Sequence, residues 1–433
     1  MLSSKQVAKW KPQDWLSKVK YMRPSKNGAV GVLFCWTTEA MNPLFDHENQ
    51  GYGNPATCDF IVKPIVGGAA PTKFAEHVMG MIADTGSPDS QPIERNSPEG
   101  KVIVQLAQKM KANSGSDYNG QPPSLHNVKA QTRVNENRDR WAQIISSYNN
   151  AQYFLIQNNI EDQKELGDEY RKGSGLSNFL SNEALIANLG KLFVADAILG
   201  NGDRLSQPNT GNIMYSSKNK FWSIDSSTVL TTYKDVLNDF TTLSWGDFNP
   251  NPQNGTEPPT SFWANGIVNY ATTSTPSPAE ASLYKQGFQP RAIPGFSLST
   301  LFEPDQWWNN VFRPHFTNHL VALAQENKKK GLHPSANPTP PTPPQWQQAL
   351  IWFKKGVDEG LAEVDRKLSG LSWFSLKSKY KSFVSKFGGD SNVDWTNFKI
   401  RRLYIRARLK GQNADAALTM VQEYVKRKSP ILY

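Results

Sequence analysis

Short runs of β-forming residues alternate with polar, turn-rich chain in the first part of the sequence. Residues 29–36 (AVGVLFCW) and 58–66 (CDFIVKPIV) combine β-branched and aromatic residues, which predicts two strands. In the second run, the apolar residues expected to face one side of a sheet are Phe60, Val62 and Ile65. A further apolar run at 151–160 (AQYFLIQNNI) predicts a buried strand that ends at polar residues.

Three segments have the apolar spacing of helices. Residues 71–86 begin with Pro-Thr, repeat apolar residues at four-residue intervals and end at a glycine. Residues 181–200 have the widest apolar face, and Ser181 or Asn182 is placed to cap their first turn. Residues 346–368 follow a Pro-rich connector and predict a long amphipathic helix. The chain therefore changes from mostly strands to mostly helices along its length.

The segment 198–228 (ILGNGDRLSQPNTGNIMYSSKNKFWSIDSST) concentrates turns and polar side chains directly after the second helix. Its two β-forming runs, NIMYS and FWSID, are separated by SKNK, which predicts a hairpin. Asp203 precedes the hairpin, Asn212 begins its first strand and Asp225 ends its second. Each residue alone is ordinary turn or cap chemistry. Their order raises the question of whether they meet around a common ligand.

Composition limits the class of protein. The 433 residues are too many for one small core and fit two or three lobes, and 38% hydrophobic with 20% charged residues indicates a globular chain. The sequence has no run of eighteen apolar residues and no apolar region typical of a cleaved signal peptide at its start. We expect a cytoplasmic protein, or one secreted without a cleavable signal into another cell, as an effector or toxin would be. Two cysteines, Cys35 and Cys58, can form neither a disulfide framework nor, alone, a zinc site.

The positive charge is concentrated near the C-terminus. The net charge is +10, and residues 396–433 hold nine Lys or Arg against two acidic residues. Such a tail suits an acidic protein partner or an anionic membrane surface, and the simpler interpretation is a solvated helix face. Nucleic acid is disfavoured as a partner because no base-stacking cluster or known nucleic-acid motif accompanies the charge.

The polar residues of the hairpin segment match the needs of phosphoryl transfer. That reaction uses a carboxylate near the acceptor hydroxyl, amide and carboxylate ligands for Mg²⁺, and a cation on the nucleotide phosphates held by an acidic partner. Asp203, Asn212 and Asp225 occupy the first three places in chain order. Upstream, Lys63 ends a strand and Glu76 lies in the first turns of the next helix, as in the lysine–glutamate pair of kinases.

A glycine-containing turn upstream of Lys63 supplies a further element of a nucleotide site. The segment 23–32 (RPSKNGAVGV) contains Gly28 and Gly31. Backbone N–H groups of a glycine turn of this kind can cover phosphates. All the elements therefore occur in the order that a two-lobed kinase requires.

The motif GDRLSQPNTGNIM…FWSID resembles the Gly-Asp-Arg, Asn-Ile-Met and Ile-Asp signature of the atypical kinases, which include phosphoinositide 3/4-kinases and their protein-kinase relatives. It is more similar still to the actin-fragmin kinase catalytic domain, in which a helix like LGKLFVADAILGNGDR leads into the catalytic loop. The resemblance extends over about residues 23–230. It implies an α+β, two-lobed protein-kinase-like fold, with a β-rich N-lobe, a mainly helical C-lobe and ATP between them.

The resemblance also implies a role for each residue of the set. Asp203 looks like the catalytic Asp, with Arg204 directly after it, and Asn212 and Asp225 look like the ligands of Mg²⁺ or Mn²⁺. Glu76 looks like the residue that orients the phosphate-binding lysine. The residues expected to contact ATP are Gly28, Gly31, Lys63 and, in a hinge that takes the adenine by backbone hydrogen bonds, Leu155, Ile156 and Asn158.

One spacing departs from the pattern of the lipid kinases. Asn212 lies nine residues after Asp203, whereas that pattern places the asparagine five residues after the aspartate. The extra residues must loop out, and Asn209 is a rival for the metal. We expect Asn212 to be the ligand. Asp225 is followed by Ser226 rather than by the glycine of the Asp-Phe-Gly pattern.

Three functions follow from these features. The first is an ATP- and Mg²⁺-dependent Ser/Thr protein kinase. The second is a kinase of phosphoinositides or small molecules, with the basic tail on a membrane, and the third is a pseudokinase that binds a partner. In each, residues 1–158 are the N-lobe, 159–332 the C-lobe, and 333–433 a Pro-rich connector with a basic helical extension packed on the C-lobe.

Overall fold

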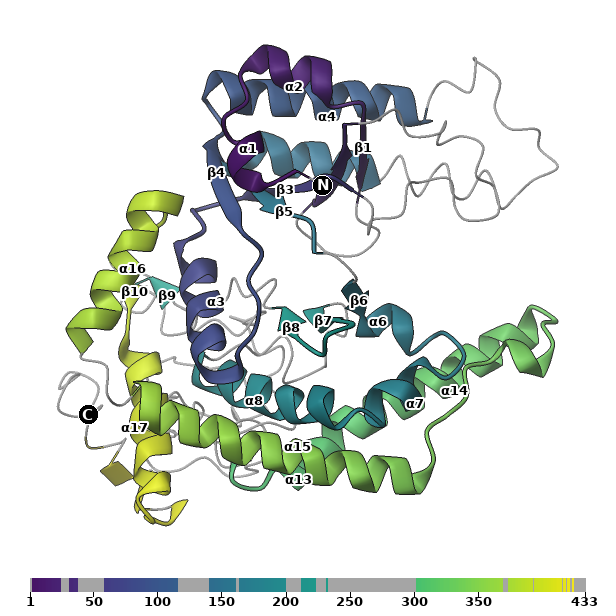
Figure 1. Cartoon of the computed structure of the whole chain (residues 1–433), viewed down its shortest axis with the longest axis vertical. Helices are drawn as coiled ribbons and strands as arrows, with labels where there is room; N and C mark the ends of the chain where they lie inside the picture. Colours follow the sequence, from purple (N-terminus) through teal and green to yellow (C-terminus); the bar gives the residue numbers. More distant parts are fainter. Residues whose placement is uncertain are drawn as a thin grey trace, which may run out of the picture. The chain divides into compact units, whose positions relative to one another are not determined.

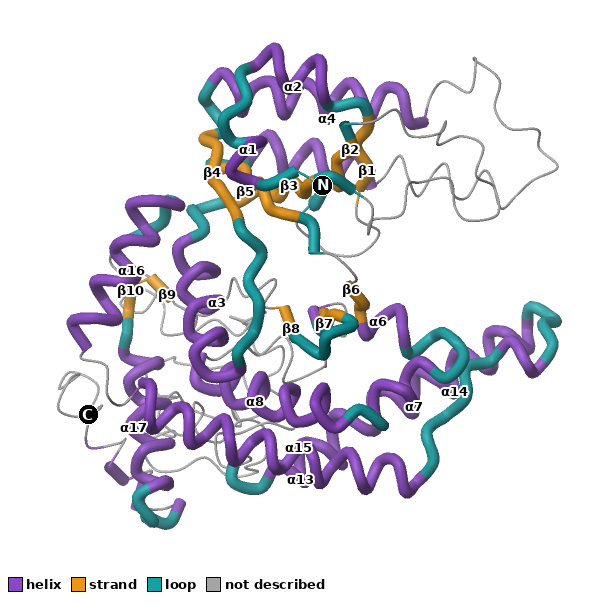
Figure 2. Tube along the Cα trace, viewed as in Figure 1, coloured by secondary structure: helices purple, strands orange, loops and turns teal. Residues whose placement is uncertain are grey.

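The computed structural model divides the chain into two compact units. The first comprises Met1–Ala70, Pro88–Asp162 and Lys381–Asp390, and the second comprises Pro71–Ser87, Gln163–Tyr380 and Ser391–Tyr433. The residues described are 2–24, 31–37, 58–115, 140–160, 163–199, 212–222, 231–232, 301–368, 373–391, 393–414, 416–417, 419–420 and 423. The fold is α+β, with a sheet in the first unit and mostly helices in the second (Figures 1 and 2).

The first unit is built on a five-stranded antiparallel sheet. Its spatial order is β1-β2-β3-β5-β4, so the third strand along the chain lies at the centre. The strands are β1 (Tyr21–Pro24), β2 (Leu33–Trp36), β3 (Phe60–Ile65), β4 (Ser90–Glu94) and β5 (Tyr153–Asn158). Strands β2, β3 and β5 lie inside the apolar runs that predicted them, whereas β1 and β4 are too short and polar to be recognised in the sequence.

One face of this sheet is covered by helices. They are α1 (Ser4–Val7), α2 (Pro12–Lys18), α4 (Pro98–Gly115) and a helix at 140–150 (Figure 1). Phe60 and Val62 of β3 belong to this core, together with Trp15 of α2 and Trp141. The Trp15 ring meets Phe60 edge-on, with 5.6 Å between centroids. This cluster supplies most of the apolar burial of the first unit.

The opposite face of the sheet carries a smaller apolar cluster. Ile65 and Leu155 pack there with Ala69 and Phe387. Because successive side chains of a strand point to opposite faces, Ile65 lies across the sheet from Phe60 and Val62. The prediction that all three share one face was therefore wrong for Ile65, which is an odd number of residues away from each of the others along the strand.

Helices dominate the second unit. Its helical segments include α3 (Ala70–Ala83), α6 (Leu166–Glu169), α7 (Gly175–Leu180), α8 (Glu183–Leu199), α13 (Pro304–Trp307), η5 (Trp308–Phe312), α14 (Arg313–Lys329), η6 (Pro334–Ala336), α15 (Pro343–Glu363), η7 (Val364–Leu368) and α17 (Thr396–Leu409). α16 (Trp373–Phe387) has residues in both units. Two small antiparallel sheets accompany them, β6 (Gln163–Glu165), β7 (Met214–Ser216) and β8 (Phe221–Trp222) in one, and β9 (Thr231–Thr232) with β10 (Val393–Asp394) in the other.

The helix predicted at 181–200 is confirmed as α8. The Asn182 side chain accepts a hydrogen bond from the Leu185 backbone N–H at 3.1 Å, so Asn182 is the N-cap. α8 is buried on nearly all sides, even at Asp196, which is 1% exposed. An apolar helix of this kind forms the centre of a domain rather than its surface.

Helices α8 and α15 approach closely because each carries glycine at the contact. A Cβ on Gly356 would lie 2.6 Å from the Ala187 carbonyl carbon, and one on Gly190 would lie 2.7 Å from the Val357 backbone nitrogen. Real side chains do not reach such distances, so these backbones are in direct contact. Within the second unit, α15 therefore packs directly on α8.

Aromatic side chains fill the space between α15 and the segment 304–316. Trp308 contacts Phe312, Trp346 and Phe353, with ring centroids 4.7 to 5.9 Å apart, and Trp307 stacks on Phe353 at 5.5 Å. Trp307, Trp308 and Trp346 are all buried. These three tryptophans are therefore core residues of the second unit.

His315 makes stability depend on pH. Burial and the neighbouring His319 lower its pKa to about 4, below its ordinary value of 6.5. Between pH 6.5 and 4 the unfolded chain binds a proton at this position and the folded chain does not. The free energy of unfolding therefore decreases as the pH is lowered through this range. We expect a loss of about 1 kcal/mol after allowance for solvent screening, measured by urea denaturation at pH 7.5 and pH 4.5. His315→Gln should flatten this dependence, and an unchanged slope in that variant would contradict it.

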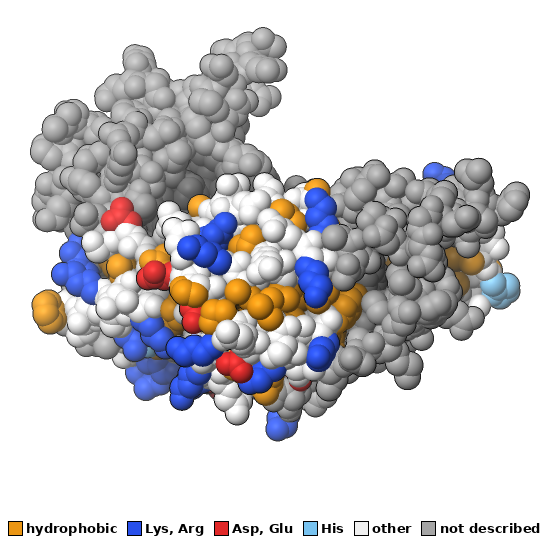
Figure 3. All heavy atoms as spheres, turned by 90° about the horizontal axis from the view of Figure 1, so that it is seen from above, with side chains coloured by type: hydrophobic (Ala, Val, Ile, Leu, Met, Phe, Trp, Pro, Cys, Tyr) orange, Lys and Arg blue, Asp and Glu red, His pale blue; other side chains and the backbone are white. Residues whose placement is uncertain are grey.

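No helix among the described residues is long and apolar enough to cross a membrane. The face shown in Figure 3 displays many Lys and Arg side chains among uncharged and hydrophobic ones, in keeping with the net charge of +10.

Part of the basic tail is buried, however. Arg401 of α17 is 2% exposed, and Arg402 donates to the Leu368 carbonyl, so α17 is not simply a solvated helix face.

Candidate functional site

The first unit places the predicted phosphate-binding residues on or beside its sheet. Lys63 lies on β3 and is 8% exposed, on the face opposite to the helix-covered core. The glycine segment joins β1 to β2. Gly31 has φ +73°, a backbone conformation that favours glycine, and a Cβ there would lie 3.3 Å from the Cβ of Ser147. Gly28 lies outside the described residues.

The predicted hinge is part of the sheet. Leu155 pairs with Lys63 and Ile156 with Val62 of β3, and both also pair with β4 on the other side. Their backbone groups are therefore part of the hydrogen-bonded ladders of the sheet. At the end of the strand, the Asn158 N–H donates to the Asp89 carbonyl at 2.9 Å. β5 ends at Asn158, so the chain from Asn159 onward is no longer a strand of this sheet. The Asn159 side chain donates to the Cys58 carbonyl at 3.0 Å.

The second unit places Glu76 in a buried polar cluster on α3. Its carboxylate forms an ion pair with Lys73 at 2.6 Å and accepts a hydrogen bond from the Ser87 hydroxyl. Both members of the ion pair are more than 90% buried, so each stabilises the charge of the other in a region that disfavours an isolated ion. Lys63 belongs to the first unit and Glu76 to the second, and their pairing stays a prediction.

Lys73 and Ser87 were not singled out in the sequence. The only sequence signal for Lys73 is its position three residues before Glu76, where side chains on a helix are neighbours. Ser87 carries no such signal, because it reaches Glu76 only after the chain has left the helix and turned back.

The predicted hairpin is confirmed. β7 and β8 pair antiparallel, with Met214 opposite Trp222 and Tyr215 opposite Phe221. β7 begins at Met214 rather than at Asn212 as predicted, so Asn212 lies two residues before the strand, next to the buried Ile213. β6 extends the sheet on the other side of β7. The hairpin is therefore held as the middle and edge of a three-stranded sheet.

The hairpin turn is attached to α8. Asn219, with φ +61°, accepts hydrogen bonds from two asparagine side chains of that region, Asn182 at 2.9 Å and Asn188 at 3.2 Å. Asparagine tolerates this left-handed conformation better than most residues. The two elements that flank residues 200–211 along the chain are thus fixed to each other.

The C-terminal end of α8 is held by a second contact. Arg401 of α17 donates to the Leu199 carbonyl at 3.2 Å, and its guanidinium is buried. A cation at this position satisfies a carbonyl that the helix leaves open and complements the helix dipole. Leu199 lies four residues before Asp203. In the sequence Arg401 is one of several cations of a basic tail, and no pattern there signals this anchoring contact.

Several predicted site residues lie outside the described part of the chain. They are Gly28, Asp203, Arg204, Asn209 and Asp225. For Asp203, Arg204 and Asn209, the structure describes the flanking elements, α8 before them and the hairpin after them. The choice between Asn209 and Asn212 as the metal ligand stays a prediction in favour of Asn212. Within the described ranges, no three His, Cys, Asp or Glu residues are grouped as a metal site would require.

The cysteines are unsuited to nucleophilic chemistry. Both Cys35 and Cys58 are free and buried. Burial raises the pKa of Cys58 to about 12 and raises that of Cys35 well above its ordinary value. The thiols therefore stay protonated at neutral pH, and the thiolate is the reactive form.

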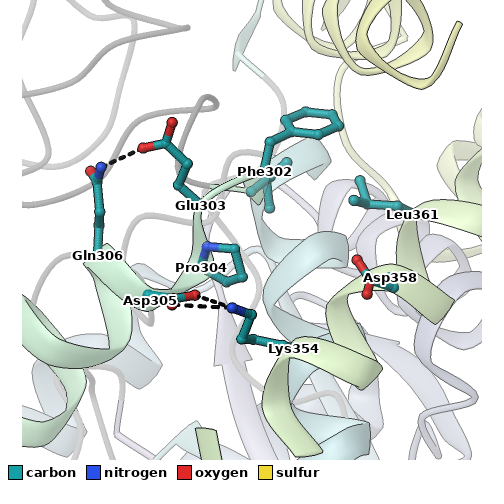
Figure 4. Close-up of a pocket in the computed structure, with 9 residues that line it drawn as sticks. Phe302, Glu303, Pro304, Asp305, Gln306, Lys354, Asp358 and Leu361 are labelled. Atoms are coloured by element: carbon teal, nitrogen blue, oxygen red, sulfur yellow. Dashed lines mark hydrogen bonds and ion pairs between the residues drawn. The ribbon is translucent and has the colours of Figure 1, made fainter. Parts of the chain in front are cut away.

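A cavity of about 470 Å³ lies in the second unit between the start of α13 and α15 (Figure 4). Lys354 points from α15 to Asp305, and their ion pair spans 2.8 Å. Asp358, Glu303 and Phe302 also line the cavity. Among the residues that the structure describes, none of those predicted for phosphoryl transfer lines this cavity.

No protein-family model matches the chain, and no curated protein matches it at a significant level.

Proposed function

We propose that this chain is an ATP- and Mg²⁺-dependent phosphotransferase with a protein-kinase-like fold, acting on Ser or Thr of a protein. The observation that carries the proposal is the sequence of elements in the first unit and at the start of the second. A glycine segment joins β1 to β2, Lys63 lies on β3, and the helix that follows β3 carries Glu76. This is the placement that a kinase gives to its glycine loop, its lysine and its glutamate.

The hairpin supports the same function. β7 and β8 form where a metal-binding hairpin is expected, with Asn212 at its entrance and Asp225 three residues past Trp222. An amide oxygen with a carboxylate is a donor set that suits Mg²⁺, which, when bound with ATP, neutralises phosphate charge. Asp203 would accept or orient the proton of the acceptor hydroxyl. Lys63 would hold the α- and β-phosphates.

The sheet also refines where adenine would be recognised. Backbone groups of Leu155 and Ile156 are used within the sheet, so they are poorly placed for a ligand. The backbone of Asn159 and Ile160, directly after β5, is the part of the described chain that leaves the ladder. We therefore propose that the adenine contact lies at the end of the predicted hinge and in the backbone directly after it.

Radiolabelled ATP tests the proposal. The purified full chain, incubated with γ-labelled ATP, Mg²⁺ and a cell lysate, should label itself or a lysate protein. Lys63→Met should lower kcat/KM for ATP by about 100-fold or more, because it removes a buried cation from the phosphates. Lys101→Met, at an exposed position of α4, is the matched control and should behave as the wild type.

The arms of this experiment separate the three functions. Labelled protein bands support the proposal, and label in phosphoinositide vesicles instead would transfer the function to a lipid kinase. A chain that neither transfers label nor shows a thermal shift with ATP and Mg²⁺ would overturn the proposal and favour a binding role.

A further inference from the structure

A short segment after α3 contacts both the helix that carries Glu76 and the strand that precedes Asp225 in the sequence. Thr85, Gly86 and Ser87, here called the link, follow α3 and stay within the second unit. On one side the Ser87 hydroxyl donates to the Glu76 carboxylate. On the other side the Gly86 N–H donates to the Phe221 carbonyl of β8 at 2.7 Å. The link therefore contacts both α3 and the strand that leads to Asp225.

The contact with β8 depends on glycine. Gly86 forms a parallel bridge with Trp222, and a Cβ on Gly86 would lie 2.6, 2.7 and 2.9 Å from three atoms of the Trp222 ring. The hairpin that carries Trp222 is itself held to α8 through its turn. A Cβ at position 86 must therefore displace the Trp222 ring, the β8 backbone or the link.

The C-terminal end of α3, which directly precedes the link, is held by a side-chain contact. The Lys367 ammonium donates to the Met81 carbonyl at 2.6 Å, which satisfies a carbonyl near the helix C-terminus. The chain then turns at Asp84, whose φ is +49°, a left-handed conformation that aspartate tolerates. These contacts leave the link little freedom to shift independently of Glu76.

We propose that the link is a positioning device, which sets the Glu76 carboxylate and the strand before Asp225 in one fixed relation. The inference rests on the proposed function. Through Ser87 the link orients the carboxylate that would hold the phosphate-binding lysine, and through Gly86 it holds β8, three residues before the predicted metal ligand. A disturbance of the link should thus alter the Mg²⁺ requirement as well as the rate.

Gly86→Ala is the first test. We expect the Mg²⁺ concentration for half-maximal activity to rise about 10-fold and kcat to fall by a similar factor, in steady-state assays of the full chain with saturating ATP. Gly80→Ala is the matched control, because a Cβ at this α3 position meets only the Thr85 carbonyl, at an ordinary 3.6 Å. It should keep the wild-type Mg²⁺ dependence.

Ser87 provides a second test that leaves the backbone unstrained. Ser87→Ala removes the hydroxyl that meets Glu76 and should lower kcat about 10-fold, whereas Ser87→Thr keeps a hydroxyl and should restore most of the rate. A thermal melt of each variant accompanies the kinetics. A folded, active Gly86→Ala variant with the wild-type Mg²⁺ half-saturation would overturn the inference, as would a Ser87→Ala variant with unchanged kcat.

Failure of the proposed function and failure of the positioning role of the link give different experimental results. If the wild-type chain transfers no phosphoryl group, the proposed function fails before any variant is compared. If the wild type is active and the link variants differ from it only in melting temperature, the link is merely structural, and the proposed function stands.

Discussion

Replacing Asp203 by alanine should abolish phosphoryl transfer while ATP binding persists. A positioned general base contributes about 10² to 10⁴ in rate, so kcat should fall within this range or beyond it. The lysine, the glycine segment and the adenine contact lie elsewhere in the chain, so the dissociation constant for ATP should change by less than about threefold. Single-turnover transfer and equilibrium binding of a fluorescent ATP analogue measure the two quantities separately.

Asp168→Ala is the control for this comparison. Asp168 is an exposed aspartate of α6 in the same unit, and its replacement should leave both transfer and binding at wild-type values. Full activity of Asp203→Ala protein would remove the catalytic assignment. Loss of ATP binding together with activity would indicate that the variant disturbs the flanking α8 and hairpin instead.

Replacing Gly356 by alanine should destabilise the second unit severely. The new methyl group would overlap the backbone of Ala187, where α15 and α8 touch, and backbone atoms of two helices cannot rotate away as a side chain can. Overpacking of this kind costs about 3 kcal/mol, a large fraction of the stability of an ordinary domain. Urea denaturation followed by circular dichroism measures the change in the free energy of unfolding.

The matched control is again Gly80→Ala, a glycine inside a helix where a methyl group fits. Alanine is the better helix former, so this variant should be unchanged or more stable by about 0.5–1 kcal/mol. If Gly356→Ala unfolds at the same urea concentration as the wild type, the close contact between α8 and α15 is not a feature of the folded protein.

Elements with a strong local pattern were predictable from the sequence. α8, α15 and the hairpin carry period-3.6 or turn signals that a window of a few residues contains in full. The N-cap at Asn182 follows the same logic, because capping is a contact between neighbouring residues. α1, α2, β1 and β4 were missed, since each is short and its residues become apolar surface only when the sheet is assembled.

In the candidate site, too, some features were predictable from the sequence and others were not. Lys63, Glu76, Asn212 and their chain order could be proposed as candidates because each lies at a predictable place on a strand, on a helix or beside a hairpin. The partners that hold them were not recognised. Glu76 meets Ser87 across a turn, and Leu199 meets Arg401 across 202 residues of sequence. No pattern along the chain records such a contact.

The sequence by itself determined the local elements of this protein and the order of the polar residues along them. Only the tertiary structure decided that β3 lies at the centre of the sheet, that Arg401 is buried at the end of α8, and that Gly86 meets Trp222. The physical reason is that periodicity and turn chemistry act between neighbouring residues. Burial, close backbone approach and the partner of a buried charge depend on which distant segments the folded chain brings together.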